Sequence, residues 1–251
     1  MTKLRADELA VRQNLAESRE KAKRLIMAGQ VLVRSGSAVV PVAKPGQQLP
    51  EDAELSLKAA ERYVGRGGEK LATAFEAFGL DVTGLVCLDA GAATGGFTDC
   101  LLQHGARTVY AVDVGRGLLH ERLRADPRVV AIEGVNLRQA PADLIPEQVD
   151  LVVADVSFIS LTLVLPACLR FLKPDGEIVA LVKPQFELGP GETDKGVVRS
   201  EAKQREAVAK VVACAEGELG LECAGVAAAK IKGPKGNQEY LAWFRRKAQA
   251  G

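Results

Sequence analysis

The chain has 251 residues, a length that fits one large domain alone or together with a small one. Hydrophobic residues make up 47% and charged residues 26%, which is ordinary for a soluble globular protein, and the net charge of +1 neither requires nor excludes a nucleic-acid partner. Five widely spaced cysteines without a C-x-x-C pair, and only two histidines, argue against a zinc site or a disulfide scaffold.

The N-terminus and the hydropathy pattern bear on location. The first residues, MTKLRADELAVRQ, are charged throughout, unlike a secretion signal, and no apolar run reaches the ~20 residues that span a bilayer. We therefore expect a cytoplasmic protein with no membrane segment and no metal ion.

The first 60 residues predict a small α+β domain. Apolar spacing at i, i+3 and i+4 predicts helices over 4–14 and 18–28, with Ser18 as N-cap and Gly29 as the stop of the second. Short β-prone runs between turn signals predict strands over 30–34, 37–42 and 53–57.

Basic residues are concentrated in this domain. Residues 1–45 hold 9 Lys/Arg and 4 Asp/Glu, a charge of +5, whereas the other 206 residues hold 24 and 28, a charge of −4. A run such as SREKAKR is by itself as often a solvated helix face as a binding surface. Its place in the one basic segment favours phosphate binding.

After a linker over 61–68, residues 69–251 predict an α/β domain. Apolar, β-branched runs at 85–91, 108–114, 128–134, 149–157 and 177–184 alternate with helical stretches at 97–104, 117–125, 161–172 and 201–219. Such alternation is typical of a doubly wound, Rossmann-like parallel sheet. The last run, 236–246, predicts one more strand, interpreted as an antiparallel edge.

A glycine-rich loop, LVCLDAGAATGGF at 85–97, follows the first strand of this domain. Ala93 stands where a dinucleotide fingerprint needs glycine, and the loop lacks the G-K-[ST] of a P-loop. A nucleoside ligand without phosphates remains, and S-adenosylmethionine fits. Asp113, 24 residues after Asp89, is placed to meet ribose hydroxyls, although an exposed strand-end carboxylate is the competing interpretation. Asn136, after the third strand, is a candidate contact on the adenine side.

Two charged residues end the next two strands. Asp155 follows VVA and Lys183 follows IVALV, and the tips of adjacent parallel strands lie only ~4.8 Å apart, so the two side chains can share one cleft. Amino-group methyltransferases favour D/N-P-P-[FY] at such a position. The segment DVSF lacks both prolines, which argues against methylation of a base nitrogen.

Five segments in order, RGGEKL, CLDAGAATGGFTDCLL, VDLVVADVSFISL, ALVKPQFE and GPKGNQEYLAW, resemble the TlyA family. In this family an S4-like RNA-binding domain precedes an FtsJ-like methyltransferase domain, and the family is also labelled haemolysin. The resemblance covers almost the whole chain. It implies S-adenosylmethionine-dependent 2′-O-methylation of cytidines in ribosomal RNA, with ribosomal subunits as partners. The chain lacks the extra C-terminal helix of longer members, which favours large-subunit RNA over small-subunit RNA.

The resemblance also implies roles for individual residues. A Lys-Asp-Lys-Glu tetrad maps onto Lys70, Asp155, Lys183 and Glu239, in which Lys183 would receive or stabilise the charge of the attacking hydroxyl. The four charges sum to zero, which lowers the cost of burying them. Together with the strand-end residues Asp89, Asp113 and Asn136, the implied cofactor contacts are Gly91, Ala92, Gly95 and Phe97. The phosphate contacts to test on the S4-like side are Arg5, Arg12, Arg19, Lys21, Lys23 and Arg24.

Two other functions stay open at this point. An RNA-binding protein with an inactive methyltransferase fold would bind ribosomes without turnover, although all four tetrad positions are filled. A membrane-active haemolysin would need a long apolar or strongly amphipathic segment, which the sequence does not show. We expect a monomer.

Overall fold

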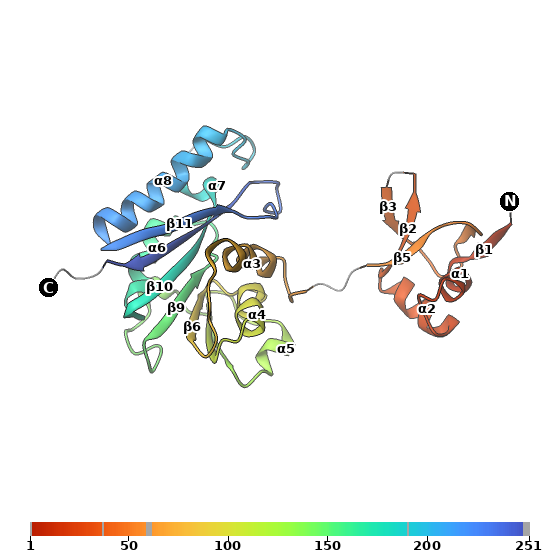
Figure 1. Cartoon of the computed structure of the whole chain (residues 1–251), viewed down its shortest axis with the longest axis horizontal. Helices are drawn as coiled ribbons and strands as arrows, with labels where there is room; N and C mark the ends of the chain where they lie inside the picture. Colours follow the sequence, from red (N-terminus) through yellow and green to blue (C-terminus); the bar gives the residue numbers. More distant parts are fainter. Residues whose placement is uncertain (1, 37, 59–61, 190, 248–251) are drawn as a thin grey trace. The chain divides into compact units, whose positions relative to one another are not determined.

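The computed structural model describes residues 2–36, 38–58, 62–189 and 191–247 (Figure 1). The chain forms two compact units, Met1–Glu61 and Arg62–Gly251, called here the N-terminal and C-terminal units. Each unit has its own buried apolar core. The domain boundary predicted at residues 60 and 61 lies outside the described residues, so the predicted division into domains stays a prediction.

The N-terminal unit packs two helices on short antiparallel strands. Strand β1 pairs with β4, and β2 lies between β3 and β5. Ser18 caps α2 as predicted, because its hydroxyl accepts a hydrogen bond from the Lys21 backbone N–H. The elements are β1 (Lys3–Arg5), α1 (Ala6–Arg12), α2 (Arg19–Met27), β2 (Val31–Ser35), β3 (Ala38–Pro41), β4 (Gln48–Pro50) and β5 (Leu55–Leu57).

The first helix is shorter than predicted at both ends. Leu4 and Arg5 belong to β1, whose partner β4 lies more than 40 residues away, so helical periodicity alone could not reveal the pairing. The helix ends at Arg12 because Asn14 takes a positive φ of 59°. The strand predicted over 37–42 is β3, and its predicted first residue, Ser37, lies outside the described residues.

The C-terminal unit is built on a seven-stranded sheet in the order β11-β12-β10-β9-β6-β7-β8. Strands β10, β9, β6, β7 and β8 run parallel, whereas β12 is antiparallel to both of its neighbours. The strands are β6 (Val86–Ala90), β7 (Thr108–Asp113), β8 (Val129–Glu133), β9 (Val149–Ala154), β10 (Leu172–Val182), β11 (Leu221–Ala228) and β12 (Tyr240–Arg246).

Helices cover both faces of this sheet (Figure 1), which confirms the doubly wound α/β fold. On one face lie α3 (Gly67–Phe78), α4 (Gly96–Gln103) and α5 (Glu121–Arg124), and on the other α6 (Leu161–Leu169) and α8 (Glu201–Glu218). The short α7 (Pro184–Glu187) follows β10, and a 3-10 turn, η1 (Leu137–Gln139), follows β8.

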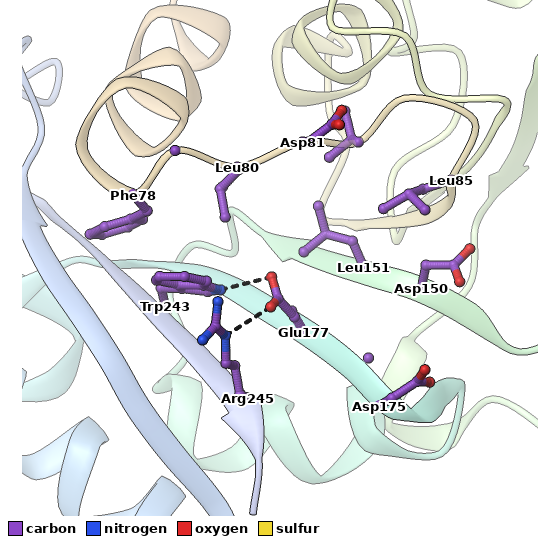
Figure 2. A pocket seen from close by; sticks show the side chains of 13 residues that line it. Phe78, Leu80, Asp81, Leu85, Asp150, Leu151, Asp175, Glu177, Trp243 and Arg245 are labelled. Carbon is purple, nitrogen blue, oxygen red and sulfur yellow. Dashed lines mark hydrogen bonds and ion pairs between the residues drawn. The ribbon is translucent and has the colours of Figure 1, made fainter.

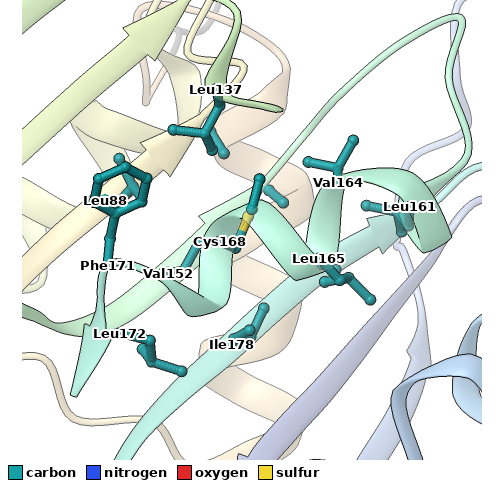
Figure 3. Close-up of a cluster of buried hydrophobic side chains, with 14 of the residues drawn as sticks. Leu88, Leu137, Val152, Leu161, Val164, Leu165, Cys168, Phe171, Leu172 and Ile178 are labelled. Atoms are coloured by element: carbon teal, nitrogen blue, oxygen red, sulfur yellow. The ribbon is translucent and has the colours of Figure 1, made fainter. Parts of the chain in front are cut away.

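The strands alternate their side chains between two cores. Figure 3 shows Leu88, Val152 and Ile178 from adjacent strands beneath Leu161 and Leu165 of α6, all of them fully buried. The neighbouring strand residues point to the opposite face and pack with α3 and α4: Cys87, Val153 and Val179. Burial on both faces explains why the strand sequences are continuously apolar.

Three sequence expectations need correction. The last strand, β12, is antiparallel as predicted, but it lies inside the sheet, and the unpredicted strand β11 forms the edge. The helix predicted over 117–125 reduces to α5, because Gly117 takes a positive φ and His120, with a ψ of 139°, is not helical. Helix α3 was not predicted, and it begins at Gly67 inside the segment interpreted as a linker.

Candidate active site

The strand order of the sheet reverses between β6 and β9, which form a topological switch point. From β6 the chain continues to β7 and β8 on one side, and later places β9 and β10 on the other. Ligands of open α/β sheets bind at the carboxyl ends of the strands at such a switch point. Here Ala90 pairs with Ala154, and the Asp155 N–H donates to the Ala90 carbonyl at 3.0 Å, so Gly91 and Asp155 meet at this edge.

A cavity of about 510 Å³ opens at this switch point. Its volume lies in the range of pockets that hold small molecules. Three predicted cofactor residues line it, Gly91, Asp113 and Asn136. Apolar side chains complete the wall and suit a flat, uncharged ring such as adenine: Val112, Val114, Leu118, Val135 and Ile159. We call this the loop cavity.

Backbone geometry at Gly91 shows why the loop requires glycine there. Gly91 has a φ of +89°, and a Cβ atom on it would lie 2.8 Å from the Asp155 carbonyl oxygen. Asp113 holds the other side of the loop, because its two carboxylate oxygens accept hydrogen bonds from Ala93 N at 2.9 Å and Gly115 N at 2.7 Å. The loop is therefore tied to both strand ends that border the cavity.

The other predicted cofactor residues, Asp89, Ala92, Gly95 and Phe97, do not line the loop cavity. Phe97 packs in the core below the loop, and a Cβ on Gly95 would lie 2.2 Å from a Leu123 methyl carbon. Asp89 is fully buried and accepts a hydrogen bond from the Thr98 hydroxyl at 2.6 Å. Its burial raises the pKa of Asp89 to about 7. These residues shape the loop from beneath.

A second cavity, of about 420 Å³, lies beside the first and is lined by three of the four predicted tetrad residues. Lys70, Lys183 and Glu239 line this cavity, and Asp155 lines the loop cavity next to it. Phe158, Phe186 and Pro234 form its apolar side. We call it the tetrad cavity.

The tetrad consists of two close ion pairs. Lys183 Nζ lies 2.6 Å from Asp155 Oδ1, and Lys70 Nζ lies 2.6 Å from Glu239 Oε2. Both lysines and Glu239 are buried, whereas Asp155 is partly exposed. Each buried charge is therefore matched by an opposite one, as charges removed from water require.

The sheet explains how four residues distant in sequence meet. Asp155 directly follows β9 and Lys183 directly follows β10. Because β12 runs antiparallel with Val182 opposite Tyr240, Glu239 enters the same edge from the opposite direction. Lys70 comes from the first turns of α3.

Sequence reasoning missed two residues of the DVSF segment. Ser157 accepts a hydrogen bond from Lys183 Nζ at 2.8 Å, and Phe158 is 90% exposed with a positive φ of 64°. The Phe158 ring packs on Phe186 with 5.0 Å between centroids. Both Ser157 and Phe158 line both cavities, so they form the seam between them. A large aromatic side chain three residues after a strand-end acid was the available signal.

The predicted phosphate contacts lie in the other unit, on β1, α1 and α2. Several of these cations are paired with acids: Arg5 and Arg19 with Asp7, Arg12 with Glu51, and Lys23 with Glu20.

A third cavity, of about 360 Å³, lies at the amino ends of β6 and β9, away from the tetrad (Figure 2). Trp243 and Arg245 donate to the Glu177 carboxylate at 3.0 and 2.9 Å. No predicted site residue is among its described lining residues. Within the described ranges, no three His, Cys, Asp or Glu side chains group as a metal site. Among the helices of those same ranges, none is long and apolar enough to cross a membrane.

Comparison with known proteins gives consistent matches. The family model of the FtsJ-like methyltransferase matches residues 63–246. The "16S/23S rRNA (cytidine-2'-O)-methyltransferase TlyA" of Mycobacterium tuberculosis is 46% identical over 243 residues, 96% of this chain and 89% of the relative. The "23S rRNA (cytidine-2'-O)-methyltransferase TlyA" of Campylobacter jejuni is 35% identical over 253 residues, which are 93% of this chain and 96% of the relative. A solved structure of a candidate hemolysin from Streptococcus thermophilus is similar with a TM-score of 0.74 and 43% identity, over 98% of this chain and 90% of that one.

Proposed function

The chain belongs to the FtsJ-like methyltransferase family, and we propose that it methylates the ribose 2′-hydroxyl of cytidines in ribosomal RNA with S-adenosylmethionine as methyl donor. The observation that carries this proposal is the meeting of two cavities at the Lys183–Asp155 pair. One cavity suits a nucleoside cofactor and the other a nucleotide acceptor. A methyl group can pass between two ligands held on either side of this seam.

The cofactor residues of this chain fit S-adenosylmethionine. Gly91 lets the loop backbone lie close to the Asp155 carbonyl at the cavity wall, and Asp113 and Asn136 offer polar contacts at two strand ends. When bound, S-adenosylmethionine supplies an electrophilic methyl group on a sulfonium.

Lys183 is the group that meets the attacking oxygen. An ammonium has three N–H donors. Ser157 accepts a hydrogen bond from one of them and the Asp155 carboxylate lies 2.6 Å from Nζ, so these two residues hold the ammonium in place for the ribose 2′-oxygen. There Lys183 stabilises the negative charge that grows on the 2′-oxygen, while the partly exposed Asp155 carboxylate accepts the hydroxyl proton and releases it to solvent. Orientation of this kind can supply roughly 7–11 kcal/mol of the barrier reduction.

The aromatic pair at the seam suits an unstacked base. Phe158 exposes its ring next to the tetrad and rests on Phe186. Sequence-specific RNA enzymes hold splayed-out bases on such aromatic faces. The target cytosine would therefore stack on Phe158 while its ribose faces Lys183.

The basic N-terminal unit supplies affinity for the RNA backbone, and ribosomal subunits in the cytoplasm are the proposed substrate. Large-subunit RNA is the favoured substrate in this proposal, because both relatives described above are named for 23S rRNA and one of them for 16S rRNA as well.

The test uses purified protein, labelled S-adenosylmethionine and separated ribosomal subunits from a strain that lacks the enzyme. We expect label on the ribose of cytidines in the large subunit, read as resistance to alkaline cleavage, and at least a hundredfold loss in Lys183→Ala. The matched control is Lys173→Ala, because Lys173 forms a 2.6 Å pair with Asp150 between the same two strands at their far ends. Wild-type protein that binds cofactor and subunits without transferring label would refute the proposed activity.

A further inference from the structure

Three charged side chains of the N-terminal unit, Arg5, Asp7 and Arg19, converge from β1, α1 and α2. Arg5 grips the Asp7 carboxylate with two hydrogen bonds, Nε to Oδ1 at 3.0 Å and NH2 to Oδ2 at 2.9 Å. Arg19 reaches the same carboxylate with NH2 at 3.5 Å from both oxygens. One acid thus joins two arginines that lie 14 residues apart.

The burial of these residues is unequal. Asp7 is 0% exposed, whereas the side chains of Arg5 and Arg19 are 42% and 52% exposed. The hydrogen bonds from Arg5 hold the pKa of Asp7 below its usual value, so the carboxylate is ionised at neutral pH. Each guanidinium has five N–H donors, and most of the donors of Arg5 and Arg19 do not bond to Asp7.

The surroundings keep the pair in place. The Asp7 backbone N–H donates to the Pro45 carbonyl at 3.0 Å. The Arg5 guanidinium lies against Gly46, where a Cβ would come within 3.2 Å of NH1. Glu8 is the next acid along α1, and it is exposed. The other paired cations of this unit meet exposed acids, Glu51 at 40% and Glu20 at 77%, which leaves those pairs free to rearrange.

We propose that Asp7 is a positioning residue that fixes Arg5 and Arg19 as one preformed binding site for a backbone phosphate of RNA. The three groups carry a net charge of +1. The outward N–H groups of the two planar guanidinium groups are already oriented before the ligand binds. Guanidinium forks bind phosphate oxygens in such fixed geometry, and preorganisation spares the entropy of ordering two long side chains. The inference deepens the proposed function, because it names how the N-terminal unit holds its RNA.

This role predicts a change in RNA affinity opposite to the change expected from net charge alone. Removing an acid from a basic surface raises its net charge, and charge alone would then strengthen RNA binding. If Asp7 positions the arginines, Asp7→Asn weakens binding although it adds a positive charge. The matched control is Glu20→Gln, which makes the same charge change next to Arg19 on an exposed side chain.

The experiment measures binding of the full-length variants to purified large subunits from the strain lacking the enzyme, across a series of KCl concentrations. We expect Asp7→Asn to bind about tenfold more weakly, with a salt slope smaller by about one, as for one lost phosphate contact. Glu20→Gln should bind as tightly as wild type or more tightly. In the transfer assay, Asp7→Asn should raise KM for the subunit and leave kcat unchanged.

A second variant covers loss of folding. If circular dichroism shows that Asp7→Asn unfolds the N-terminal unit, the double variant Arg5→Lys, Arg19→Lys retains Asp7 and the full charge but removes the forks, and it should bind about tenfold more weakly. Unchanged or tighter binding by a folded Asp7→Asn, or unchanged binding by the double variant, overturns the proposal. Wild-type protein that binds RNA without methylating it would instead refute the proposed function alone.

Discussion

Asp89 shows how burial alone changes a carboxyl group. It lies at the end of β6 without solvent contact and has the Thr98 hydroxyl as a hydrogen-bond donor. Burial disfavours the charged form, which raises the pKa of Asp89 to about 7. The unfolded chain releases the same proton near its ordinary pKa of about 3.9. Between these two values the unfolded state binds fewer protons, so stability falls as pH rises.

This predicts a pH-dependent effect of Asp89→Asn. The melting temperature of the variant, relative to that of wild type, should rise as pH increases from about 4 to about 7. The difference between the two melting temperatures should level off beyond pH 7. Thermal unfolding at pH 5, 6, 7 and 8 measures it. The exposed Asp175→Asn is the control and should follow wild type. A difference that is constant across this range would contradict the raised pKa.

Phe158 allows stability to be separated from recognition, because its side chain is 90% exposed. Phe158→Ala should leave the melting temperature unchanged and lower kcat/KM on ribosomal subunits about tenfold, since stacking of a base on an aromatic ring contributes ~1–3 kcal/mol. Leu163→Ala removes another exposed apolar side chain, on α6, and should change neither quantity. Equal activity of both variants would exclude Phe158 as the base platform.

At the scale of elements, the loop between β6 and α4 determines how close the backbone comes to the cleft. Two glycines of the C-terminal unit allow the effect of backbone strain to be distinguished from the effect of a steric clash. Gly91 and Gly84 both have positive φ, 89° and 75°, but only at Gly91 would a Cβ meet backbone, the Asp155 carbonyl at 2.8 Å. At Gly84 nothing lies within 4 Å.

Comparison of the two alanine variants therefore isolates the close approach. Gly84→Ala should lose about 1–2 kcal/mol of unfolding free energy and keep its affinity for S-adenosylmethionine. Gly91→Ala should lose at least as much stability and bind the cofactor at least tenfold more weakly, because Asp155 must move. Denaturant unfolding and calorimetric titration measure the two quantities. Equal cofactor affinity in both variants would argue against the loop cavity as the cofactor site.

At the scale of the whole molecule, the two units have separate cores. The helices and strands of residues 3–57 bury their own apolar side chains, and the sheet of the C-terminal unit buries another set on each face. Folding of one unit therefore does not depend on the core of the other, while the proposed activity uses both.

Removal of residues 1–61 should consequently separate the two tasks. We expect the remaining chain to fold and to bind S-adenosylmethionine as tightly as the full-length protein, but to bind ribosomal subunits at least tenfold more weakly and with a smaller salt slope. Calorimetry and filter binding measure these quantities, with full-length Lys183→Ala as a control that retains RNA binding. Undiminished affinity of the truncated chain would place the RNA contacts in the C-terminal unit.

Local patterns in the sequence were sufficient for the fold class, and they predicted where the candidate site lies. Continuous apolar runs and helical spacing predicted the doubly wound sheet, because burial on both faces leaves a signal within each strand. The strand-end positions of Gly91, Asp155 and Lys183 predicted the cleft, because parallel strands end at a common edge. The resemblance of RGGEKL and GNQEY to a known family supplied Lys70 and Glu239, which periodicity alone could not reach.

Only the tertiary structure decided which residues face each other. It paired Lys183 with Asp155 and Lys70 with Glu239, placed Asp89 below the loop, and put β11 rather than β12 at the edge. It also joined Arg5 and Arg19 through Asp7. These outcomes depend on strand register and on packing between residues far apart in the chain. Such long-range choices leave no periodic trace in the sequence.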